Sequence, residues 1–563
     1  MTILDTGGYL IYHGNPVEAV MYFKKLDAQI NSEVGECPTC GNVNPELIFN
    51  IIEARVVDEF GNYTDSRKVE PVKWEENFNK NIEPERVEKT TESPPKSLNI
   101  PNWFNQLKIY FQRDFFSKIS NTQYIALTFL EAPLLGLILS YIIRYIADPN
   151  SNTYIFRENE NIPIYIFMSL IVALFLGFMV SAEEIFRDRK ILKRESFLNL
   201  SRSSYLISKI LILFSISAIQ AFTFVIIGNS LLAIKGMNFE YWFALFSTAA
   251  FANMLGLNIS ASFNSAVTIY IIIPLLMIPM MILSGAMFSF DKMNRRVGSV
   301  DKVPLLAEFM PTKWSFEALM VNQFKNNKFQ SEFFNLEKIE SNADFKQVYY
   351  IPELFERLDN VSDELSEKDK IKETAGDLQL LKNEIEYQNM VVEKVQFENP
   401  ALLIPDDFTI DVAIETEEYL EKLNKYYSTL FSTAYQLKEQ EIEKKLAEDP
   451  DSYNKMKNAH HNEAVSEWVK KVFEKNKILE YDYRLVQQID PIYQDPRVSG
   501  FLSIRSHFYA PRKHFMGKFY DTFWFNMIFV WLLTISFYIL LYYNILKKML
   551  DYFGKIKFSR KPA

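Results

Sequence analysis

Residues 241–290 read YWFALFSTAAFANMLGLNISASFNSAVTIYIIIPLLMIPMMILSGAMFSF, without a single charged side chain. A helix needs about 20 apolar residues to cross the hydrocarbon core of a bilayer, so this stretch is long enough for two crossings. A small polar turn at residues 258–264 separates the two. Because backbone polar groups inside a bilayer must be hydrogen-bonded within their own segment, both crossings are predicted to be helices.

Four further windows have the length and composition of membrane-spanning helices. Residues 161–182, 210–234 and 522–546 carry no charge, and residues 119–143 carry only Glu131. The predicted fold class is therefore an α-helical membrane protein with six transmembrane helices. Residues 291–521, between the fifth and sixth spans, are predicted to form a large, mainly helical exoplasmic domain.

Basic residues orient these helices. Seven lysines and arginines lie between residues 187 and 209, and six lie between residues 547 and 561. Loops rich in Lys and Arg stay in the cytoplasm, which predicts a multi-pass protein of the cytoplasmic (inner) membrane with both termini cytoplasmic. The only cysteines, Cys37 and Cys40, fall on that side. An exoplasmic domain without disulfides favours a bacterial protein.

Composition along the chain predicts its division into parts. The polar, charged stretch around Ser93-Pro94-Pro95 reads as a linker, and Trp103, Leu107 and Phe111 lie at helical spacing just before the first span. The predicted parts are a globular N-terminal part at 1–60, a linker at 61–101, an amphipathic helix at 102–118, spans one to five at 119–290, the exoplasmic domain at 291–521, span six at 522–547 and a basic cytoplasmic tail at 548–563.

Two apolar stripes mark long helices in the predicted exoplasmic domain. Ile371, Leu378, Ile385 and Val392 recur every seven residues, and a second stripe runs from Leu420 to Leu437. Two such helices would pair as an antiparallel hairpin. The same stripes would also serve simply as the core of the domain.

Catalytic and metal-binding motifs are missing from the sequence. It contains no GxxxxGK[ST] phosphate loop, so an ATPase active site is not encoded here and any enzymatic activity depends on an ATPase encoded elsewhere. The five histidines have no metal-ligand spacing with Cys37 and Cys40, which form only half of a zinc knuckle. No metal, resident cofactor or nucleic-acid partner is predicted.

Glu131 is the one charged residue predicted to lie at mid-membrane. A carboxylate at that depth is costly and commonly faces a cavity or a partner group. Two interpretations stay open: a role in ion coupling or substrate contact, and a packing residue whose carboxyl is hydrogen-bonded, for example by Gln220.

Several short motifs follow one another in a fixed order, and together they resemble the G subfamily of ABC transporters. Residues 4–23, Cys37-Pro38 and Asn44-Pro45 resemble the last part of its ATPase domain. Further similar segments are the connecting helix (103–113), the first intracellular loop (180–209), the fourth and fifth spans (256–261 and 283–285) and the segment after the fifth span (311–324). The resemblance implies that this chain begins inside an ATPase-domain tail.

The resemblance also implies roles for individual residues. Coupling to the ATPase would involve Arg113, Glu183, Glu184, Arg187 and Glu195, with an Arg113–Glu184 ion pair between connecting helix and loop. Helical spacing separately predicts a Glu183–Arg187 pair. Phe175, Phe178, Thr268, Tyr270 and Met277 would line a substrate cavity, and Ala286 and Met287 would form an external plug.

The leading hypothesis is the transmembrane subunit of an ATP-driven ABC exporter for a hydrophobic or amphipathic substrate. Its partners would be an ABC ATPase, which would bind ATP and Mg²⁺, a second identical or related membrane half, and the lipid bilayer. A second hypothesis is a mechanical transmitter that moves an envelope partner through the exoplasmic domain. A third is a membrane anchor without transport.

Overall fold

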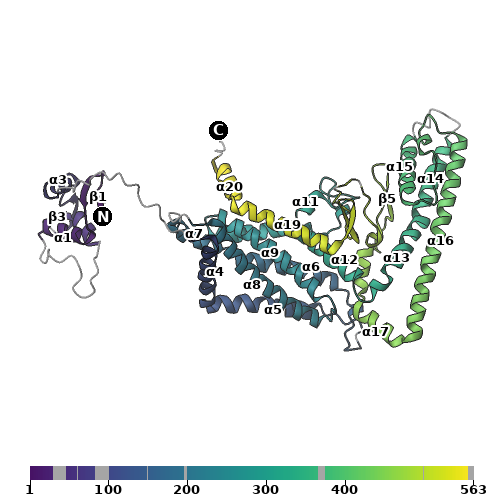
Figure 1. Ribbon diagram of the computed structural model, residues 1–563, viewed down its shortest axis with the longest axis horizontal. Helices are drawn as coiled ribbons and strands as arrows, with labels where there is room; N and C mark the ends of the chain where they lie inside the picture. The colour runs from purple at the N-terminus through teal and green to yellow at the C-terminus, as the bar shows by residue number, and fades with distance from the viewer. Residues whose placement is uncertain are drawn as a thin grey trace. The chain divides into compact units, whose positions relative to one another are not determined.

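The structure is a computed structural model that describes residues 1–28, 46–59, 61–82, 101–148, 150–195, 200–364, 374–498, 500–501 and 503–555. Cys37, Cys40, Ile371 and the end of the basic tail lie outside these residues. The chain divides into two compact units, Met1–Asn99 and Ile100–Ala563, each of which has its own arrangement (Figure 1).

The first unit is a small α/β unit with two antiparallel strand pairs. Strand β1 (Thr2–Leu4) pairs with β2 (Leu10–His13), and β3 (Arg55–Val57) pairs with β4 (Tyr63–Arg67). Its helices are α1 (Pro16–Leu26), α2 (Glu46–Ile52) and α3 (Pro71–Asn81). The core gathers apolar side chains from all three helices and from β2, among them Ile11, Phe23, Ile48 and Trp74.

The prediction of a linker over residues 61–101 is wrong for residues 61–82. Strand β4 and helix α3 lie there, and Trp74 of α3 packs edge-on against Phe23 with ring centroids 5.4 Å apart. Arg67 forms an ion pair with Asp5 at 2.8 Å. Trp74 and Phe78 lie four residues apart, so α3 has a narrow apolar face inside a segment whose overall composition is polar.

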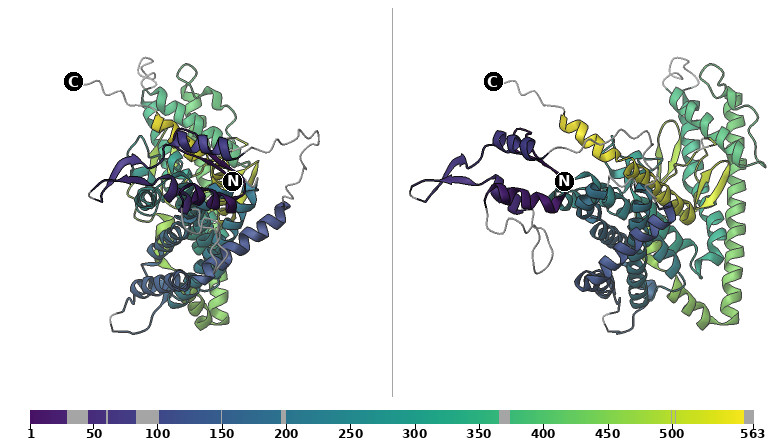
Figure 2. Two further views of the ribbon diagram at one scale, coloured as in Figure 1. Left: turned by 90° about the vertical axis from the view of Figure 1, so that its left-hand side faces the viewer. Right: turned by 60° about the vertical axis from the view of Figure 1, so that its left-hand side comes forward.

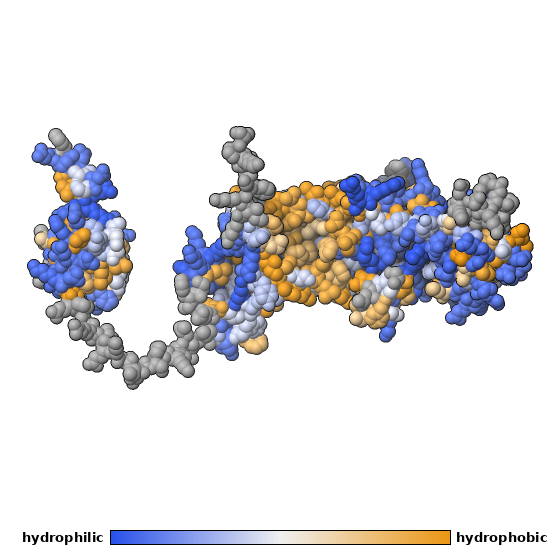
Figure 3. All heavy atoms as spheres, turned by 90° about the horizontal axis from the view of Figure 1, so that it is seen from above, coloured by the Kyte–Doolittle hydropathy of each residue, from blue (hydrophilic) through white to orange (hydrophobic). Residues whose placement is uncertain are grey.

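Among the described residues of the second unit, five helices are long and apolar enough to cross a membrane, by the criterion of length and composition. They are α5 (Thr122–Ile143), α6 (Ile162–Ser181, which continues into α7, Glu184–Glu195), α8 (Arg202–Leu231), α9 (Asn238–Ser262) and α19 (Thr522–Tyr542). In Figure 3 a broad apolar band covers this part, with hydrophilic surface on both sides of it. This is the surface expected of a multi-pass membrane protein.

Helices α6 and α9 form the tightest contact in the bundle. A Cβ atom on Gly177 would lie 2.6 Å from the carbonyl oxygen of Ala249 and 2.8 Å from the Cβ atom of Ala252. Only glycine at this position lets the two backbones approach so closely, as is common between membrane helices. The packing holds α6 and α9 closely together within the bundle.

The fifth predicted span corresponds to a shorter helix. Helix α10 (Ala266–Ile282) has 17 residues, with Pro274 and Pro279 inside it. At 1.5 Å per residue this is about 26 Å, slightly less than the hydrocarbon thickness of about 30 Å. Six crossings therefore remain a proposal.

The region between α10 and α19 is mainly helical, with two strand pairs (Figure 2). Its helices are α11 (Leu305–Glu308), α12 (Pro311–Lys325), α13 (Gln330–Phe345), α14 (Ile351–Asp363), α15 (Ala375–Val391), α16 (Ile410–Glu448), α17 (Pro450–His460) and α18 (Glu463–Lys470). The strand pairs are β5 (Ile478–Glu480) with β6 (Leu485–Gln487) and β7 (Arg512–Phe515) with β8 (Lys518–Asp521). A π-helix, η4 (Lys346–Tyr350), joins α13 to α14.

Further elements flank these regions. Helix α4 (Trp103–Ser120) matches the predicted amphipathic helix, and α20 (Ile545–Lys555) follows α19. Short 3-10 turns lie at η1 (Phe156–Glu158), η3 (Phe290–Lys292), η5 (Pro400–Leu402) and η6 (Pro491–Tyr493).

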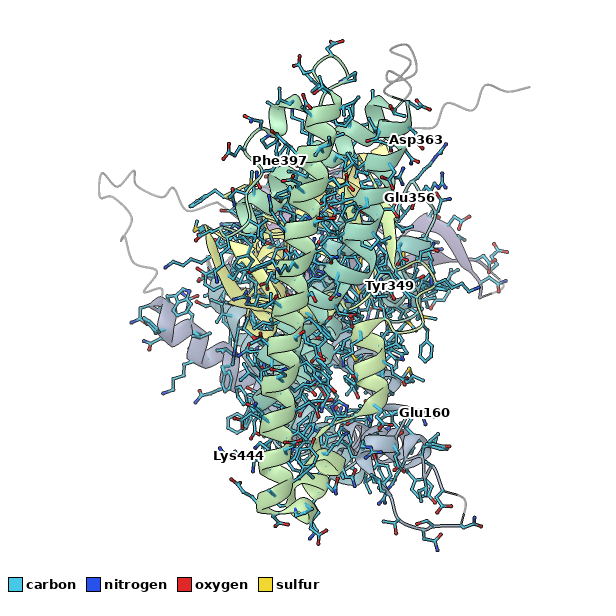
Figure 4. All side chains as sticks on the ribbon, turned by 90° about the vertical axis from the view of Figure 1, so that its right-hand side faces the viewer. Glu160, Tyr349, Glu356, Asp363, Phe397 and Lys444 are labelled. Carbon is cyan, nitrogen blue, oxygen red and sulfur yellow. The ribbon has the colours of Figure 1, made fainter. Side chains whose placement is uncertain are left out.

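The two predicted stripes lie on α15 and α16, and they form a shared core. Leu378, Ile385, Leu420 and Leu423 are all fully buried in it. Helix α16 nevertheless packs chiefly on α13 and α14, and α15 packs chiefly on α14, so the two do not form a simple hairpin. Figure 4 shows Glu356 and Asp363 along α14 beside α16, with Phe397 near one end of α16 and Lys444 toward the other.

Candidate functional site

Five charged residues from three helices meet where α4, α7 and α8 pack together. This corner cluster consists of Asp114 and Lys118 of α4, Glu184 and Asp188 of α7, and Lys209 of α8. The Lys209 ammonium lies 2.7 Å from Asp114 Oδ1 and 3.0 Å from both Glu184 Oε2 and Asp188 Oδ2. Lys118 pairs with Glu184, and all five side chains are at most 19% exposed.

The corner cluster holds α7 in a defined position relative to the membrane helices. The Tyr205 hydroxyl adds a hydrogen bond to Asp188 Oδ2 at 2.9 Å, and Ser201 N donates to Gln106 Oε1 at 2.7 Å between α8 and α4. Buried ionic groups tolerate loss of a partner poorly, because the remaining charge has no water to solvate it. These contacts connect α7 to both α4 and α8.

The other side of α7 is bound to the end of α9. Ser260 Oγ accepts hydrogen bonds from the backbone N–H groups of Ile185 and Phe186, at 3.1 and 3.0 Å. Arg189 donates to the carbonyl oxygens of Ala261 and Phe263, at 3.0 and 2.6 Å. A guanidinium at a helix C-terminus satisfies free carbonyl groups and complements the helix dipole.

The predicted coupling residues all lie in this part of the structure, with different partners. The Glu183–Arg187 ion pair is confirmed, at 2.6 Å. The predicted Arg113–Glu184 pair is wrong: Arg113 binds Glu195 at 2.7 Å, while Glu184 is bound by Lys118 and Lys209. Glu184 thus connects α7 to α4 and α8 inside the structure. The sequence signal was Lys209 itself, a lysine in the first turns of an otherwise apolar helix.

The exposed face of α7 is basic. Arg187, Lys190, Lys193 and Arg194 are all exposed on it. Such a face suits an acidic protein surface or anionic lipid, and it borders the buried corner cluster.

The five predicted cavity residues separate into two groups. Phe178 is fully buried and Met277 nearly so, both within the core of the bundle. Phe175 and Tyr270 are exposed, at 39% and 46%, and Thr268 is half-buried. The Tyr270 hydroxyl donates to Glu183 Oε1 at 2.9 Å, which links α10 to α7. Only Phe175, Thr268 and Tyr270 thus have surface to offer a second chain or a ligand in this conformation.

The predicted plug residues follow a turn that requires glycine. Gly285 has φ +81°, and a Cβ atom there would lie 2.5 Å from the ring of Phe508. The backbone N–H of Ala286 donates to Ser284 Oγ at 3.1 Å. Ala286 and Met287 line a large cavity in the region between α10 and α19.

Glu131 flanks the packed face of α5. The buried residues of this helix, Thr128, Ala132, Gly136 and Ser140, recur every four positions against α8. Within the described residues the Glu131 carboxyl has neither an ion pair nor a hydrogen bond, and Gln220 donates instead to the carbonyl oxygen of Thr128 at 2.8 Å. The expected contact from Gln220 to Glu131 is thus not formed.

A second buried ionic group, here called the Glu317 node, was not predicted. Glu317 of α12 accepts from Lys513 Nζ of β7 at 2.5 Å and from Asn526 Nδ2 of α19 at 3.0 Å. Lys313 lies 3.3 Å from Glu317 and 3.1 Å from Glu308. The signal in the sequence was Lys313 and Glu317, an i, i+4 pair on a helix that is buried all round.

Electrostatics keep the Glu317 node charged. Burial disfavours the Glu317 carboxylate, but the ammonium groups of Lys313 and Lys513 outweigh this and hold its pKa below the ordinary value. Burial lowers the pKa of Lys513 to about 8, with Glu317 opposing that shift. The node therefore joins α11, α12 and β7 by buried ion pairs, and the hydrogen bond from Asn526 adds α19.

Comparisons with known proteins agree with this architecture. Residues 105–324 match the family model of the ABC-2 type transporter, so this part of the chain carries an ABC-2-type membrane domain. The ABC transporter G family member STR of Medicago truncatula is 25% identical over 248 residues, 43% of this chain and 28% of that protein. The protein of the same name from Petunia hybrida is 24% identical over 314 residues, 54% of this chain and 34% of that protein. The chain spans about a third of the length of the curated relatives it matches.

Proposed function

We propose that this chain is the membrane part of an ATP-driven exporter, which works with an ABC ATPase and with a second membrane half. The observation that carries the proposal is the position of α7, braced by the corner cluster on one side and by the end of α9 on the other. The ABC-2 match over residues 105–324 covers this whole assembly. Six crossings, with both termini in the cytoplasm, would place α4 and α7 on the side of the ATPase.

The contacts of α7 suggest how ATPase movement would reach the membrane helices. A force on the basic face of α7 passes through Lys209 to α8 and through Ser260 to α9. Helix α9 is packed on α6 through Gly177, and Tyr270 connects α10 to Glu183. Four membrane helices thus respond together, and the exposed side chains of Phe175, Thr268 and Tyr270 would change surroundings as two halves separate. A hydrophobic or amphipathic substrate fits such a surface.

A second function, mechanical transmission, is favoured by contacts between the membrane helices and the region between α10 and α19, here called the inserted region. Asn462 Nδ2 donates to the carbonyl oxygens of Phe156 and Asn159 just before α6, at 2.7 and 2.9 Å. Arg157 forms an ion pair with Glu463 at 2.9 Å. Motion of α6 would move the inserted region and any envelope partner bound to it.

The basic face of α7 offers a direct test of the coupling proposal. In the complete transporter, purified with its ATPase, Arg187→Glu/Lys190→Glu should lower ATPase activity at least about tenfold through repulsion from an acidic docking surface. The matched control is Lys425→Glu/Lys444→Glu, which reverses two exposed lysines on α16.

Normal ATPase activity and normal association in the α7 variant would refute the proposed coupling surface. Equal losses in the α7 variant and the α16 control would indicate a general effect of net charge. Substrate flux measured in proteoliposomes separates export from mechanical transmission, since only export moves a compound across the bilayer.

A further inference from the structure

The region between α10 and α19 encloses a cavity of about 920 Å³. Its walls come from the segment after α10, from α13 and η4, from α15, from α18 and from the loop after β6. This volume lies at the upper end of the range of small-molecule sites, which is about 300–1,000 Å³. The cavity is therefore large enough for a ligand of drug or lipid-fragment size.

Lys346 is the unusual side chain on this wall. It opens the π-helix η4, and its ammonium lies 3.2 Å from the centroid of the Tyr350 ring. Within the described residues no carboxylate lies at ion-pair distance from it. A π-helix inserts an extra residue into a helical turn and is common at functional sites.

Glu384, the acid that acts electrostatically on Lys346, cannot serve as its full counterion. Glu384 is already bound by the Arg497 guanidinium through two hydrogen bonds, at 2.9 and 3.0 Å. Its oxygens also accept from the Tyr350 hydroxyl at 2.7 Å and from Leu485 N at 3.0 Å. Lys346, Glu384 and Arg497 together therefore leave one positive charge without a matching negative one.

The buried surroundings of the Lys346 ammonium disfavour its positive charge. Burial lowers the pKa of Lys346 to about 7, although Glu384 pulls it upward. Two other cations on the cavity wall have carboxylate partners: Lys292 pairs with Glu474 at 2.9 Å and Lys471 with Asp291 at 3.5 Å. An anion beside Lys346 would restore the balance.

Several apolar side chains on the same cavity wall are exposed to solvent. Met287 is 51% exposed, Val391 56%, Met390 80% and Phe473 79%, and all four line the cavity. Large apolar residues exposed together in a concave site are typical of ligand-binding surfaces. The cavity thus combines Lys346, a cation with no carboxylate at ion-pair distance among the described residues, with an apolar wall.

We propose that this cavity binds an amphipathic anion, whose carboxylate or phosphate head pairs with Lys346 and whose apolar body covers Met287, Val391 and Phe473. The inference goes beyond the proposed transport function and does not depend on it, since binding at equilibrium requires no ATPase.

The test uses the full chain in phosphatidylcholine nanodiscs and isothermal titration calorimetry with octanoate as the probe. Octanoate should bind saturably, whereas 1-octanol, which has the same chain without the charge, should bind at least about tenfold more weakly. Lys346→Gln should weaken octanoate binding by a similar factor. The control Lys292→Gln/Glu474→Gln removes a paired cation and its partner from the same wall without changing net charge, and it should bind octanoate like the unmodified chain.

Equal affinity for octanoate and 1-octanol would overturn the proposal even if Lys346→Gln did not fold, because that comparison uses only the unmodified chain. Unchanged binding in a folded Lys346→Gln variant would overturn it as well. A final arm replaces phosphatidylcholine by phosphatidylglycerol. Competition with octanoate would identify a lipid head group as the anion, and lack of competition would identify a soluble one.

Discussion

The corner cluster and the Glu317 node are two buried ionic groups that differ in their charges and in how their carboxylates are bound. In the node, the carboxylates of Glu308 and Glu317 face the buried ammonium groups of Lys313 and Lys513, and Arg505 Nε lies 4.0 Å from Glu308 Oε1. The corner cluster has three carboxylates and two ammonium groups, which leaves a net charge of −1. Asp114 Oδ2 is buried there without a hydrogen-bond partner among the described residues.

The two groups thus differ in one buried acceptor: both oxygens of Glu317 accept hydrogen bonds, whereas Asp114 Oδ2 accepts none among the described residues. Through these bonds the Glu317 node fastens α12 to β7 and α19. An unpaired buried carboxylate oxygen is a strained state that a new donor would relieve. The corner cluster, beside the basic face of α7, is where such a donor would arrive.

Breaking the Glu317 node should have the largest effect on stability. Glu317→Ala leaves Lys313 and Lys513 buried without their shared partner, which should cost about 3–5 kcal/mol or prevent folding. Thermal unfolding of the purified chain measures this, with Glu332→Ala as the control because Glu332 lies in an exposed ion pair with Lys445. An unfolding temperature unchanged in Glu317→Ala would show that the node does not fasten α12 to α19.

Removing Lys209, the central cation of the corner cluster, should destabilise the protein somewhat less than Glu317→Ala does. Lys209→Met leaves three carboxylates near Lys118, yet protonation can neutralise them, so we expect about 2–4 kcal/mol. Lys209→Met/Glu184→Gln restores the original charge difference and should recover a large part of the loss. If the double variant is as unstable as the two single changes added together, the cluster is not a coupled unit.

A fall in pH should destabilise the inserted region more than the corner cluster. His461 and His507 lie in that region, and burial lowers the pKa of each to about 4. Their unfolded value is near 6.5, so folding opposes protonation. Stability is fully present above pH 6.5 and is lost as the pH falls toward 4, by about 1–3 kcal/mol per histidine.

Hydrogen exchange at pH 7.0 and 4.5 should show faster opening around α18, η6 and β7 than at α7. His507→Gln should reduce this pH dependence.

The sequence predicted the membrane helices well because bilayers impose length and composition on each segment separately. Residues 119–143, 161–182 and 522–546 contain α5, α6 and α19, and residues 210–234 overlap α8, which begins earlier, at Arg202. The short α10 and the folded residues 61–82 were harder, since their structure depends on two prolines and on the contact of Trp74 with Phe23. Local composition contains no information about such a contact.

Ion-pair partners were predictable only within a helix. Glu183 and Arg187 are four residues apart, and their pairing follows from helix geometry. Glu184 binds Lys118 and Lys209, whose positions depend on how three helices cross. The Glu317 node required residues from the far end of a long insertion, and the roles of Glu131 and of the cavity residues stay predictions.

The smallest effect is expected for the exposed pair that replaced the predicted one. Arg113 and Glu195 are 39% and 24% exposed, so their ion pair, 2.7 Å long, should contribute at most about 1 kcal/mol to stability. Arg113→Glu should leave the unfolding temperature almost unchanged, and Arg113→Glu/Glu195→Arg should restore any loss. By contrast, Glu184→Lys should unfold the corner, and no reversal at Arg113 should rescue it, because Glu184 is bound by Lys118 and Lys209. Rescue of Glu184→Lys by Arg113→Glu would instead mean that these two residues meet in another state of the protein, and that the corner cluster exchanges partners as α7 moves.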